Sequence, residues 1–197
     1  MCGRFQATTS AAELARLFKA AGPLPNVQQR YNAAPTQDLP VVLRDRETGE
    51  RRIEALRWGL IPFWAKDAKI GFSTINAKAE TVATAPAFRD AFKSRRCLVP
   101  ADGFYEWQKL DAKTKQPYRF AMADGTPFAF AGLWERWKEP ASGETVRSFT
   151  IITTAPNALC ATVHNGIDTL TRRSRAKGAK AGPCSRSRTL ATASRPM

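Results

Sequence analysis

The residue with the most distinctive chemistry is Cys2, which directly follows Met1. Once Met1 is removed, Cys2 carries an α-amine and a thiol on adjacent carbons. The amine can attack an aldehyde to give an imine, and the thiol can then close on the same carbon to form a thiazolidine ring. Because an α-amine titrates near pH ~7.7–8.0, part of it is the neutral nucleophile at cellular pH. The dipeptide alone, however, favours a simpler explanation, a start codon that happens to precede a small residue.

Two side chains are candidates for proton transfer. Glu106 lies between Tyr105 and Trp107 in an apolar run, and strand alternation places it on the same face as Phe104. Partial removal from water suits a carboxyl group for general acid–base work, whereas a glutamate on the solvent face of an edge strand would be structural. His164 is the only histidine, so any imidazole acid or base must be this residue. A surface or helix-end histidine is the structural alternative.

An asparagine and a group of aromatic residues complete the candidates. Asn76 could orient an amine or a sugar oxygen, or it could form a turn. Residues 58–66 combine aromatic side chains, a turn and Lys66. Exposed aromatic rings beside basic residues form a stacking platform for single-stranded nucleic acid. We expect Trp58 to be buried in the core and Trp64, in a loop beside Lys66, to be exposed.

The charge of the chain indicates a polyanionic partner. The 197 residues carry a net charge of +14, with a sequence pI near 10.2. Residues 165–197 contain eight Lys and Arg residues and one acid, Asp168, so they hold +7 and leave +7 for residues 1–164. Nucleic acid is the most common partner of such a protein. A length of 197 residues fits one domain, or one domain with an appendage.

The hydrophobic pattern predicts mostly strands. Runs typical of strands cover 39–43, 53–58, 97–100, 103–107, 118–121, 128–134 and 148–153. A capping box at residues 10–13 begins a helix that Gly22 should end, and two more helices fit residues 87–93 and the segment after residue 157. Residues 30–35 are too irregular for an element and are interpreted as a structured loop. The pattern predicts an α+β fold: a single compact domain with a β-rich, partly barrel-like core and a few peripheral helices.

Two further features define the class of protein. Residues 165–197 contain no aromatic residue and few large apolar residues, so we interpret them as a disordered tail that follows a domain at 1–164. The four cysteines show no paired spacing, so neither a metal site nor a disulfide framework is indicated, and Cys97 and Cys160 should be small core residues. Without an apolar run long enough for a membrane span or a signal segment, a soluble, cytoplasmic protein is expected.

Six motifs in one order make the sequence similar to a known family. They are Met-Cys-Gly-Arg-Phe at 1–5, Arg-Tyr-Asn at 30–32 with Pro35, Trp-Gly-Leu-x-Pro-x-Trp at 58–64, Asn-Ala-Lys-x-Glu-Thr at 76–81, Arg-Cys-Leu-x-Pro-Ala-x-Gly-x-Tyr-Glu-Trp at 96–107, and His164. Residues 1–164 thereby resemble the SOS response-associated peptidase (SRAP) family, the abasic-site processing proteins. The resemblance implies a compact mixed α/β domain with a β-rich core and a basic groove.

The resemblance also implies an activity. Members of the family form a thiazolidine between the N-terminal cysteine and the ring-opened aldehyde of an abasic site in single-stranded DNA, and this crosslink shields the lesion. By this resemblance, Cys2 is the nucleophile, Asn76 orients the reacting groups, Glu106 transfers protons, and His164 assists sugar opening or imine steps. The same site would remove the residue that precedes the cysteine, which makes the protein a self-crosslinking, lyase-like enzyme with autoproteolytic activity.

The same resemblance assigns the DNA contacts. Arg4 and Lys78 should meet phosphates, and Pro35 and Trp64 should pack on the DNA at the lesion. The implied partner is single-stranded DNA containing abasic sites. No metal or organic cofactor and no membrane are implied, and a monomer near the replicating nucleoid is expected. Two alternatives from other classes remain: a non-catalytic basic nucleic-acid-binding protein, and a cysteine peptidase that acts on other proteins.

The sequence departs from the family pattern at three places. Lys78 replaces a frequent arginine, which keeps the charge and loses the bidentate fork, and Pro86 stands where a basic residue is common. After His164, the family usually continues with a His-x-Arg-Met-Pro-like segment and further apolar residues that complete the fold. Here the Arg/Ser/Ala-rich segment follows instead. We therefore interpret residues 165–197 as a disordered or frame-shifted tail, with the usual C-terminal elements missing.

Overall fold

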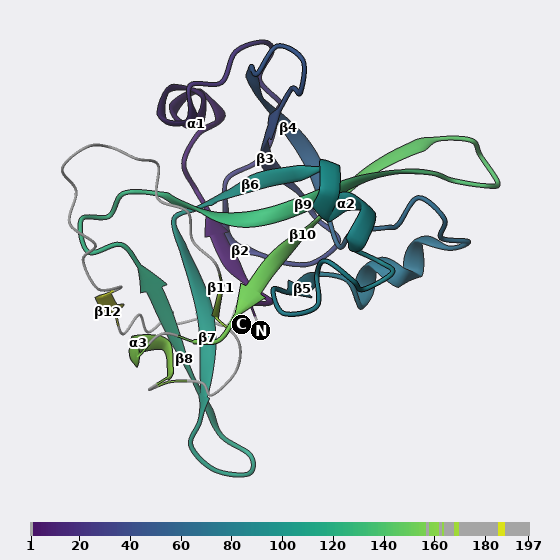
Figure 1. Cartoon of the computed structure of the whole chain (residues 1–197). Helices are drawn as coiled ribbons and strands as arrows, with labels where there is room; N and C mark the ends of the chain where they lie inside the picture. The colour runs from purple at the N-terminus through teal and green to yellow at the C-terminus, as the bar shows by residue number, and fades with distance from the viewer. Residues whose placement is uncertain (1, 157, 162, 164–167, 170–184, 188–197) are drawn as a thin grey trace, which may run out of the picture.

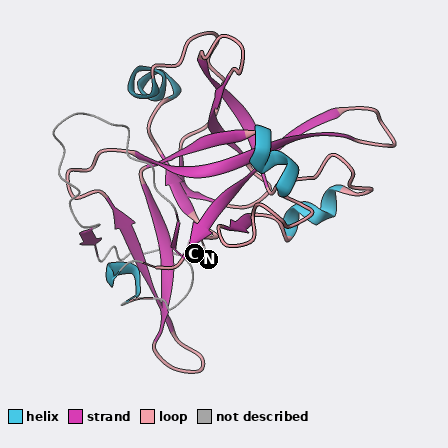
Figure 2. Cartoon of the chain, in the orientation of Figure 1, coloured by secondary structure: helices cyan, strands magenta, loops and turns pink. Residues whose placement is uncertain are grey.

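The computed structural model describes residues 2–156, 158–161, 163, 168–169 and 185–187, and strands predominate among them (Figures 1 and 2). The strands are β1 (Phe5–Ala7), β2 (Arg30–Ala33), β3 (Asp38–Arg44), β4 (Arg51–Trp58), β5 (Asn76–Lys78), β6 (Arg96–Ala101), β7 (Gly103–Lys109), β8 (Lys115–Ala121), β9 (Phe128–Lys138), β10 (Thr145–Thr154), β11 (Asp168–Thr169) and β12 (Ser185–Ser187). The helices are α1 (Ala11–Phe18), α2 (Arg89–Ser94) and α3 (Ala158–Ala161), together with the 3₁₀ helix η1 (Ala68–Phe72).

Five strands close into a barrel. In the order β10-β4-β3-β6-β9, each strand pairs with the next, and β9 pairs back with β10. The β10–β4 pair is parallel and the other four pairs are antiparallel. The short strand β5 pairs with β10 in parallel. This arrangement confirms the predicted α+β class with a β-rich, barrel-like core.

Alternation along the barrel strands separates an inner core from an outer layer. Leu39, Val41 and Leu43 of β3 belong to the main buried cluster inside the barrel, whereas Val42 belongs to a second cluster with Leu14 of α1. Since successive strand residues point to opposite faces, one strand contributes to both clusters. The helix α1 therefore covers the outside of the β3–β4 pair (Figure 1).

A second sheet places the N-terminus next to the barrel. Its strand order is β12-β8-β7-β1-β2, so β1 lies between β2 and β7. Phe5 of β1 is directly opposite Ala33 of β2 and Phe104 of β7. The Phe5 ring also contacts Trp58, with a centroid distance of 5.1 Å. The second sheet and the barrel therefore share one hydrophobic core, in which Phe5 is fully buried.

The seven predicted strand runs all lie within strands, but the prediction for residues 30–35 is wrong. That segment was expected to be a loop, and Arg30–Ala33 forms β2. Tyr31 and Asn32 are exposed, so the segment carries no hydrophobic alternation that would indicate a strand. It becomes a strand because its backbone pairs with β1.

Both ends of α1 have clear physical causes. Ser10 accepts a hydrogen bond of 3.2 Å from the Glu13 backbone N–H, as the capping box predicts. The expected end at Gly22 is wrong, because the helix stops at Phe18. Lys19 then adopts a left-handed conformation, with φ of 52°, and its N–H bonds back to Arg16 and Ala15 carbonyls. The other two predicted helices are present as α2 and α3.

The segment 165–197 was expected to be disordered. Within it, Asp168–Thr169 forms β11, paired with β10, and Ser185–Ser187 forms β12, paired with β8. The backbones of these five residues gain partners at the edges of existing sheets. The interpretation of the segment as a disordered or frame-shifted tail stays a prediction. The rest of the segment lies outside the described residues, as does His164. The domain boundary at 164 stays a prediction. In the described part of the chain, no helix is both long and apolar enough to span a membrane.

Candidate active site at Cys2

Cys2 lies just before β1, inside the main core cluster. Its side chain is 1 % exposed and shares that cluster with Phe5, Phe104 and Val163. The Sγ atom lies 3.8 Å from the Arg4 carbonyl oxygen, to which its thiol donates. The reactive group predicted from the sequence is thus held in an apolar environment from which water is excluded.

Asn76 contacts Cys2 directly. Its Nδ2 donates a hydrogen bond of 3.0 Å to the Cys2 backbone carbonyl. Asn76 is held in β5, which pairs with β10 through Asn76 opposite Ile151. The Oδ1 atom of Asn76 is buried and accepts no hydrogen bond within the part of the chain that the structure describes. A buried acceptor without a donor costs free energy, so this oxygen is available to a donor that enters the site.

Glu106 lies on the strand next to Cys2. Tyr105 of β7 donates its N–H to the Arg4 carbonyl at 3.0 Å, and because the two strands are antiparallel, the next residue of β7, Glu106, lies beyond the start of β1 in the direction of Cys2. Glu106 is 8 % exposed and Phe104 is 4 % exposed, whereas Tyr105 is half-buried. The predicted alternation is confirmed: the carboxyl group shares the buried face with Phe104. The alternative, a glutamate on the solvent face of an edge strand, is excluded by this burial.

Trp58 connects the site to the loop that contains Pro35. Its Nε1 donates to the Ile75 carbonyl at 3.0 Å, next to Asn76, and its own carbonyl accepts from Thr36 N–H at 2.8 Å. Trp58 is fully buried, as the sequence predicts. Pro35 is half-buried and directly precedes Thr36, which has a positive φ of 72°. Pro35 thus lies in a turn whose position is set by the same tryptophan that supports Asn76.

A close approach of two glycines sets the course of the loop before Asn76. Gly59 has φ of 116°, and a Cβ atom there would collide with the Gly71 carbonyl oxygen. Only glycine fits this backbone position. The contact closes the segment between β4 and β5, in which Trp64 lies.

Arg4 and Lys78, the two residues predicted to contact phosphates, are solvent-exposed. Arg4 donates from Nη1 to Asn32 Oδ1 at 3.3 Å. Lys78 lies two residues after Asn76 in β5, on the same face, while Ala77 between them is buried. Arg4 therefore lies two positions from Cys2, and Lys78 lies two positions from Asn76.

Trp64 is 48 % exposed, as predicted, and its neighbour Phe63 is 56 % exposed. The loop that holds them is anchored by Trp137, whose Nε1 donates to the Ala65 carbonyl at 2.7 Å. Phe72, at the end of η1, is 63 % exposed. Sequence reasoning identified Trp64 and missed Phe72. The sequence did offer a signal for the exposure of Phe72, because this large aromatic residue lies in a segment with no strand periodicity.

The remaining cysteines differ from Cys2 in role. Cys97 and Cys160 are buried core residues, as predicted, at 7 % and 6 % exposure. Burial raises the pKa of the Cys97 thiol, which keeps it protonated. Within the described ranges, no three His, Cys, Asp or Glu side chains are grouped so that they could hold a metal ion.

Sequence reasoning missed two polar contacts around the start of β1. The Tyr105 hydroxyl donates to the Tyr31 carbonyl at 2.9 Å, and Asn32 accepts from Arg4. The first contact ties β2 to β7, and the second ties β2 to the segment that begins with Cys2. The Arg-Tyr-Asn motif already singled out these residues, but their partners lie far away in the sequence.

The fold and the site together define a β-rich domain built around a cysteine next to the N-terminus. The chain belongs to the family described as SOS response associated peptidase (SRAP), whose model matches residues 1–175. The resemblance inferred from the six motifs is thereby confirmed. The match extends 11 residues beyond His164.

The relatives share a name that describes their activity. The abasic site processing protein YoqW of Bacillus subtilis (strain 168) is 44 % identical over 167 residues, which are 84 % of this chain and 73 % of YoqW. The abasic site processing protein HMCES of Xenopus tropicalis is 35 % identical over 153 residues, 64 % of this chain and 45 % of HMCES. A crystal structure of a Bacteroides thetaiotaomicron protein superposes with a TM-score of 0.77 at 26 % identity, covering 86 % of this chain and 75 % of that one.

Proposed function

We propose that this chain processes abasic sites in single-stranded DNA by forming a covalent DNA–protein crosslink through Cys2. The observation that carries the proposal is the hydrogen bond between Asn76 and the Cys2 carbonyl, because it connects the proposed nucleophile to the residue proposed to orient it. The buried Glu106 lies on β7, the strand that pairs with β1. Relatives at 44 % and 35 % identity are named abasic site processing proteins, and this supports the substrate class.

The proposed reaction has three steps. First, Met1 is removed, which leaves Cys2 with an α-amine. This amine then attacks the aldehyde carbon of the ring-opened abasic sugar, and loss of one water gives an imine. Finally the Cys2 thiol adds to the imine carbon: a carbon–sulfur bond forms and the thiol proton goes to nitrogen. The product is a thiazolidine, and its mass is that of protein plus DNA less one water.

Three residues are proposed to assist these steps. Glu106 transfers protons, a role suited to a buried carboxyl group on β7, the strand paired with β1. The buried Oδ1 of Asn76 accepts a hydrogen bond from the amine or from a sugar hydroxyl. His164, which directly follows the buried Val163 in the sequence, assists sugar opening or imine steps.

The burial of Cys2 favours a single-stranded substrate. At 1 % exposure the thiol is reached only by a sugar that enters the site, and enzymes that act on nucleotides of a duplex use single strands or extrude the nucleotide. Arg4 and Lys78 would neutralise phosphates, while Trp64 and Pro35 would pack against the DNA at the lesion. The exposed ring of Trp64 suits base stacking.

We further propose that the same site removes Met1, in keeping with the peptidase description of the family. The protein would then act as a monomer that associates with DNA undergoing replication. Residues 1–164 would carry the chemistry and the lesion selectivity, and the basic residues after 164 would add charge without selectivity.

One experiment separates this proposal from its rivals. Purified protein is incubated with two oligonucleotides of one sequence, one undamaged and one with a single abasic site, and then analysed on a denaturing gel. The proposal requires covalent DNA mass only with the abasic oligonucleotide. A non-catalytic binder would give no covalent product with either, and a peptidase acting on other proteins would instead cleave an added protein substrate.

A further inference from the structure

A basic cleft lies beside the β9–β10 hairpin, which projects from the barrel (Figure 1). Its lining residues are Asp38, Ala55, Arg57, Arg136, Thr145, Val146 and Arg147, and its volume is about 590 Å³. Three arginines and one aspartate give the lining a net charge of +2. None of these residues belongs to the site around Cys2.

Strand register places two of the arginines opposite each other, and the third lines the same cleft from the neighbouring strand β4. Arg136 of β9 is directly opposite Arg147 of β10, and Ser148, the next residue in β10, is opposite Arg57 of β4. Like charges directly opposite one another in a sheet are destabilising. An anion that binds between the two guanidinium groups attracts both, and this attraction outweighs the repulsion between them.

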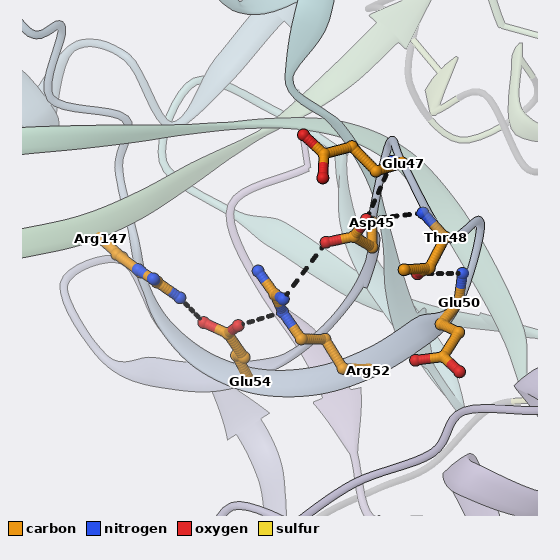
Figure 3. A network of polar contacts seen from close by, with 7 residues as sticks. All are labelled: Asp45, Glu47, Thr48, Glu50, Arg52, Glu54 and Arg147. Atoms are coloured by element: carbon orange, nitrogen blue, oxygen red, sulfur yellow. Dashed lines mark hydrogen bonds and ion pairs between the residues drawn. The ribbon is translucent and has the colours of Figure 1, made fainter.

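Arg147 is held in place from its other side. Its guanidinium bonds to Glu54, which also accepts from Arg52 at 2.5 Å, and Arg52 in turn lies 3.9 Å from Asp45 (Figure 3). The Arg147 guanidinium carbon also lies 5.9 Å from the centroid of the Trp134 ring. The side chain is therefore oriented before any ligand arrives.

The other two guanidinium groups have no such partner. Across the residues that the structure describes, neither Arg57 nor Arg136 makes an ion pair, although Asp38 is opposite Arg57 in the register. Arg136 is exposed and Arg57 is half-buried. Planar guanidinium groups with unused donors match the geometry of phosphate oxygens.

We propose that this cleft binds backbone phosphates of the single strand that flanks the reacting nucleotide, with Arg57 and Arg136 as the phosphate ligands and Arg147 as an oriented third cation. The proposal rests on the proposed function, since it extends the same DNA strand to a second surface. Phosphate contacts supply affinity and orientation without reading the sequence.

The strand β10 connects the arginine-lined cleft to the site around Cys2, so it gives a minimum distance between them. Asn76, which contacts Cys2, is opposite Ile151, and Arg147 lies four residues earlier in β10, a span of about 13 Å. The residues of β10 between these positions are buried, so a DNA strand must pass around them, and at roughly 3.4 Å per nucleotide its path from the lesion takes at least about four nucleotides. Only an oligonucleotide longer than this on the relevant side can occupy both surfaces.

The test compares a short and a long abasic oligonucleotide, with roughly two and fifteen nucleotides on each side of the lesion, against the four-nucleotide span. The double variant Arg57→Gln/Arg136→Gln removes two positive charges. Its control, Lys113→Gln/Lys115→Gln, removes the same charge from exposed positions in the β7–β8 hairpin. The crosslinking rate with the short oligonucleotide reports folding and chemistry, and binding of the long one is measured over a range of salt concentrations.

The arginine variant should keep the wild-type rate on the short oligonucleotide. On the long one, its slope of log affinity against log salt should fall by about 1.4, since each single-strand phosphate contact contributes about 0.7. An unchanged slope on the long oligonucleotide, or an equal fall in the lysine control, would overturn the assignment. If the wild-type protein crosslinks neither oligonucleotide, the proposed function fails instead.

Discussion

Asn76 donates a hydrogen bond of 3.0 Å to the backbone carbonyl of Cys2, a residue 74 positions earlier in the chain. The contact joins β5, which is attached to the barrel, to the segment that begins the second sheet. A hydrogen bond of this kind contributes about 1 kcal/mol to stability. Its larger consequence is positional, because it fixes the backbone that carries both reacting groups of Cys2.

Replacing Asn76 should therefore slow crosslinking more than it destabilises the fold. For Asn76→Ala we expect a rate loss of up to about 100-fold, because small misplacements of reacting groups have effects of that size. Single-turnover time courses on an abasic oligonucleotide measure the rate, and thermal melting measures stability. Asn32→Ala is the control, since it removes the Arg4 contact and leaves the Cys2 carbonyl bonded. A wild-type rate for Asn76→Ala would contradict the positioning role.

Glu106→Gln keeps the shape of the buried side chain and removes its titrating group. If Glu106 transfers protons, crosslink formation or reversal should slow by ~10²–10⁴-fold. His164→Ala should also slow formation, and the two losses should not add if both residues serve one proton path. Time courses for the two single variants and the double variant measure this. Wild-type formation and reversal by Glu106→Gln would show that the carboxyl group is structural.

The strands of the barrel could be predicted because their side chains alternate between two clusters. Leu39, Val41 and Leu43 point inward and Val42 outward, and this pattern is visible in the sequence. The strand at Arg30–Ala33 could not be found in this way, because its exposed side chains carry no periodicity and its pairing with β1 decides its conformation.

The site was predictable in type but not in geometry. Residue chemistry made Cys2, Glu106 and Asn76 candidates, and only the order of six motifs favoured the functional interpretation of each over the structural one. No local pattern could show that Asn76 bonds to the Cys2 carbonyl, because the contact depends on how two sheets meet. The cleft with Arg57 and Arg136 was missed for the same reason: its residues come from separate strands.

Trp64→Ala should weaken binding of single-stranded DNA. Stacking of one base on an aromatic ring contributes about 1–3 kcal/mol, which corresponds to roughly a 5- to 150-fold increase in Kd. Fluorescence anisotropy with an undamaged oligonucleotide measures the affinity without the covalent step. Leu110→Ala, at an exposed apolar side chain in the β7–β8 turn, is the control and should have no effect. Equal affinities for Trp64→Ala and wild type would exclude a stacking role.

Cys97 should make stability depend on pH. Burial raises the pKa of its thiol, whereas an unfolded thiol titrates near ~8.5. Above that pH the unfolded chain binds fewer protons than the folded one, so the free energy of unfolding should fall as pH rises, while below it the contribution of the buried thiol is fully present. Urea titrations between about pH 7 and pH 10 measure this. Cys97→Ala should lose less stability over that range, and an identical pH dependence in both proteins would refute the assignment.

The most direct test of the central claim is Cys2→Ser. Serine keeps the α-amine after Met1 removal and lacks the thiol, so an imine can form and the thiazolidine ring cannot. Intact mass after incubation with an abasic oligonucleotide should show, for the wild type, a chain without Met1 joined to DNA less one water and stable to heat. Cys2→Ser should give an adduct only when a borohydride reductant traps the imine. A heat-stable crosslink from Cys2→Ser at wild-type yield without reductant would contradict the account.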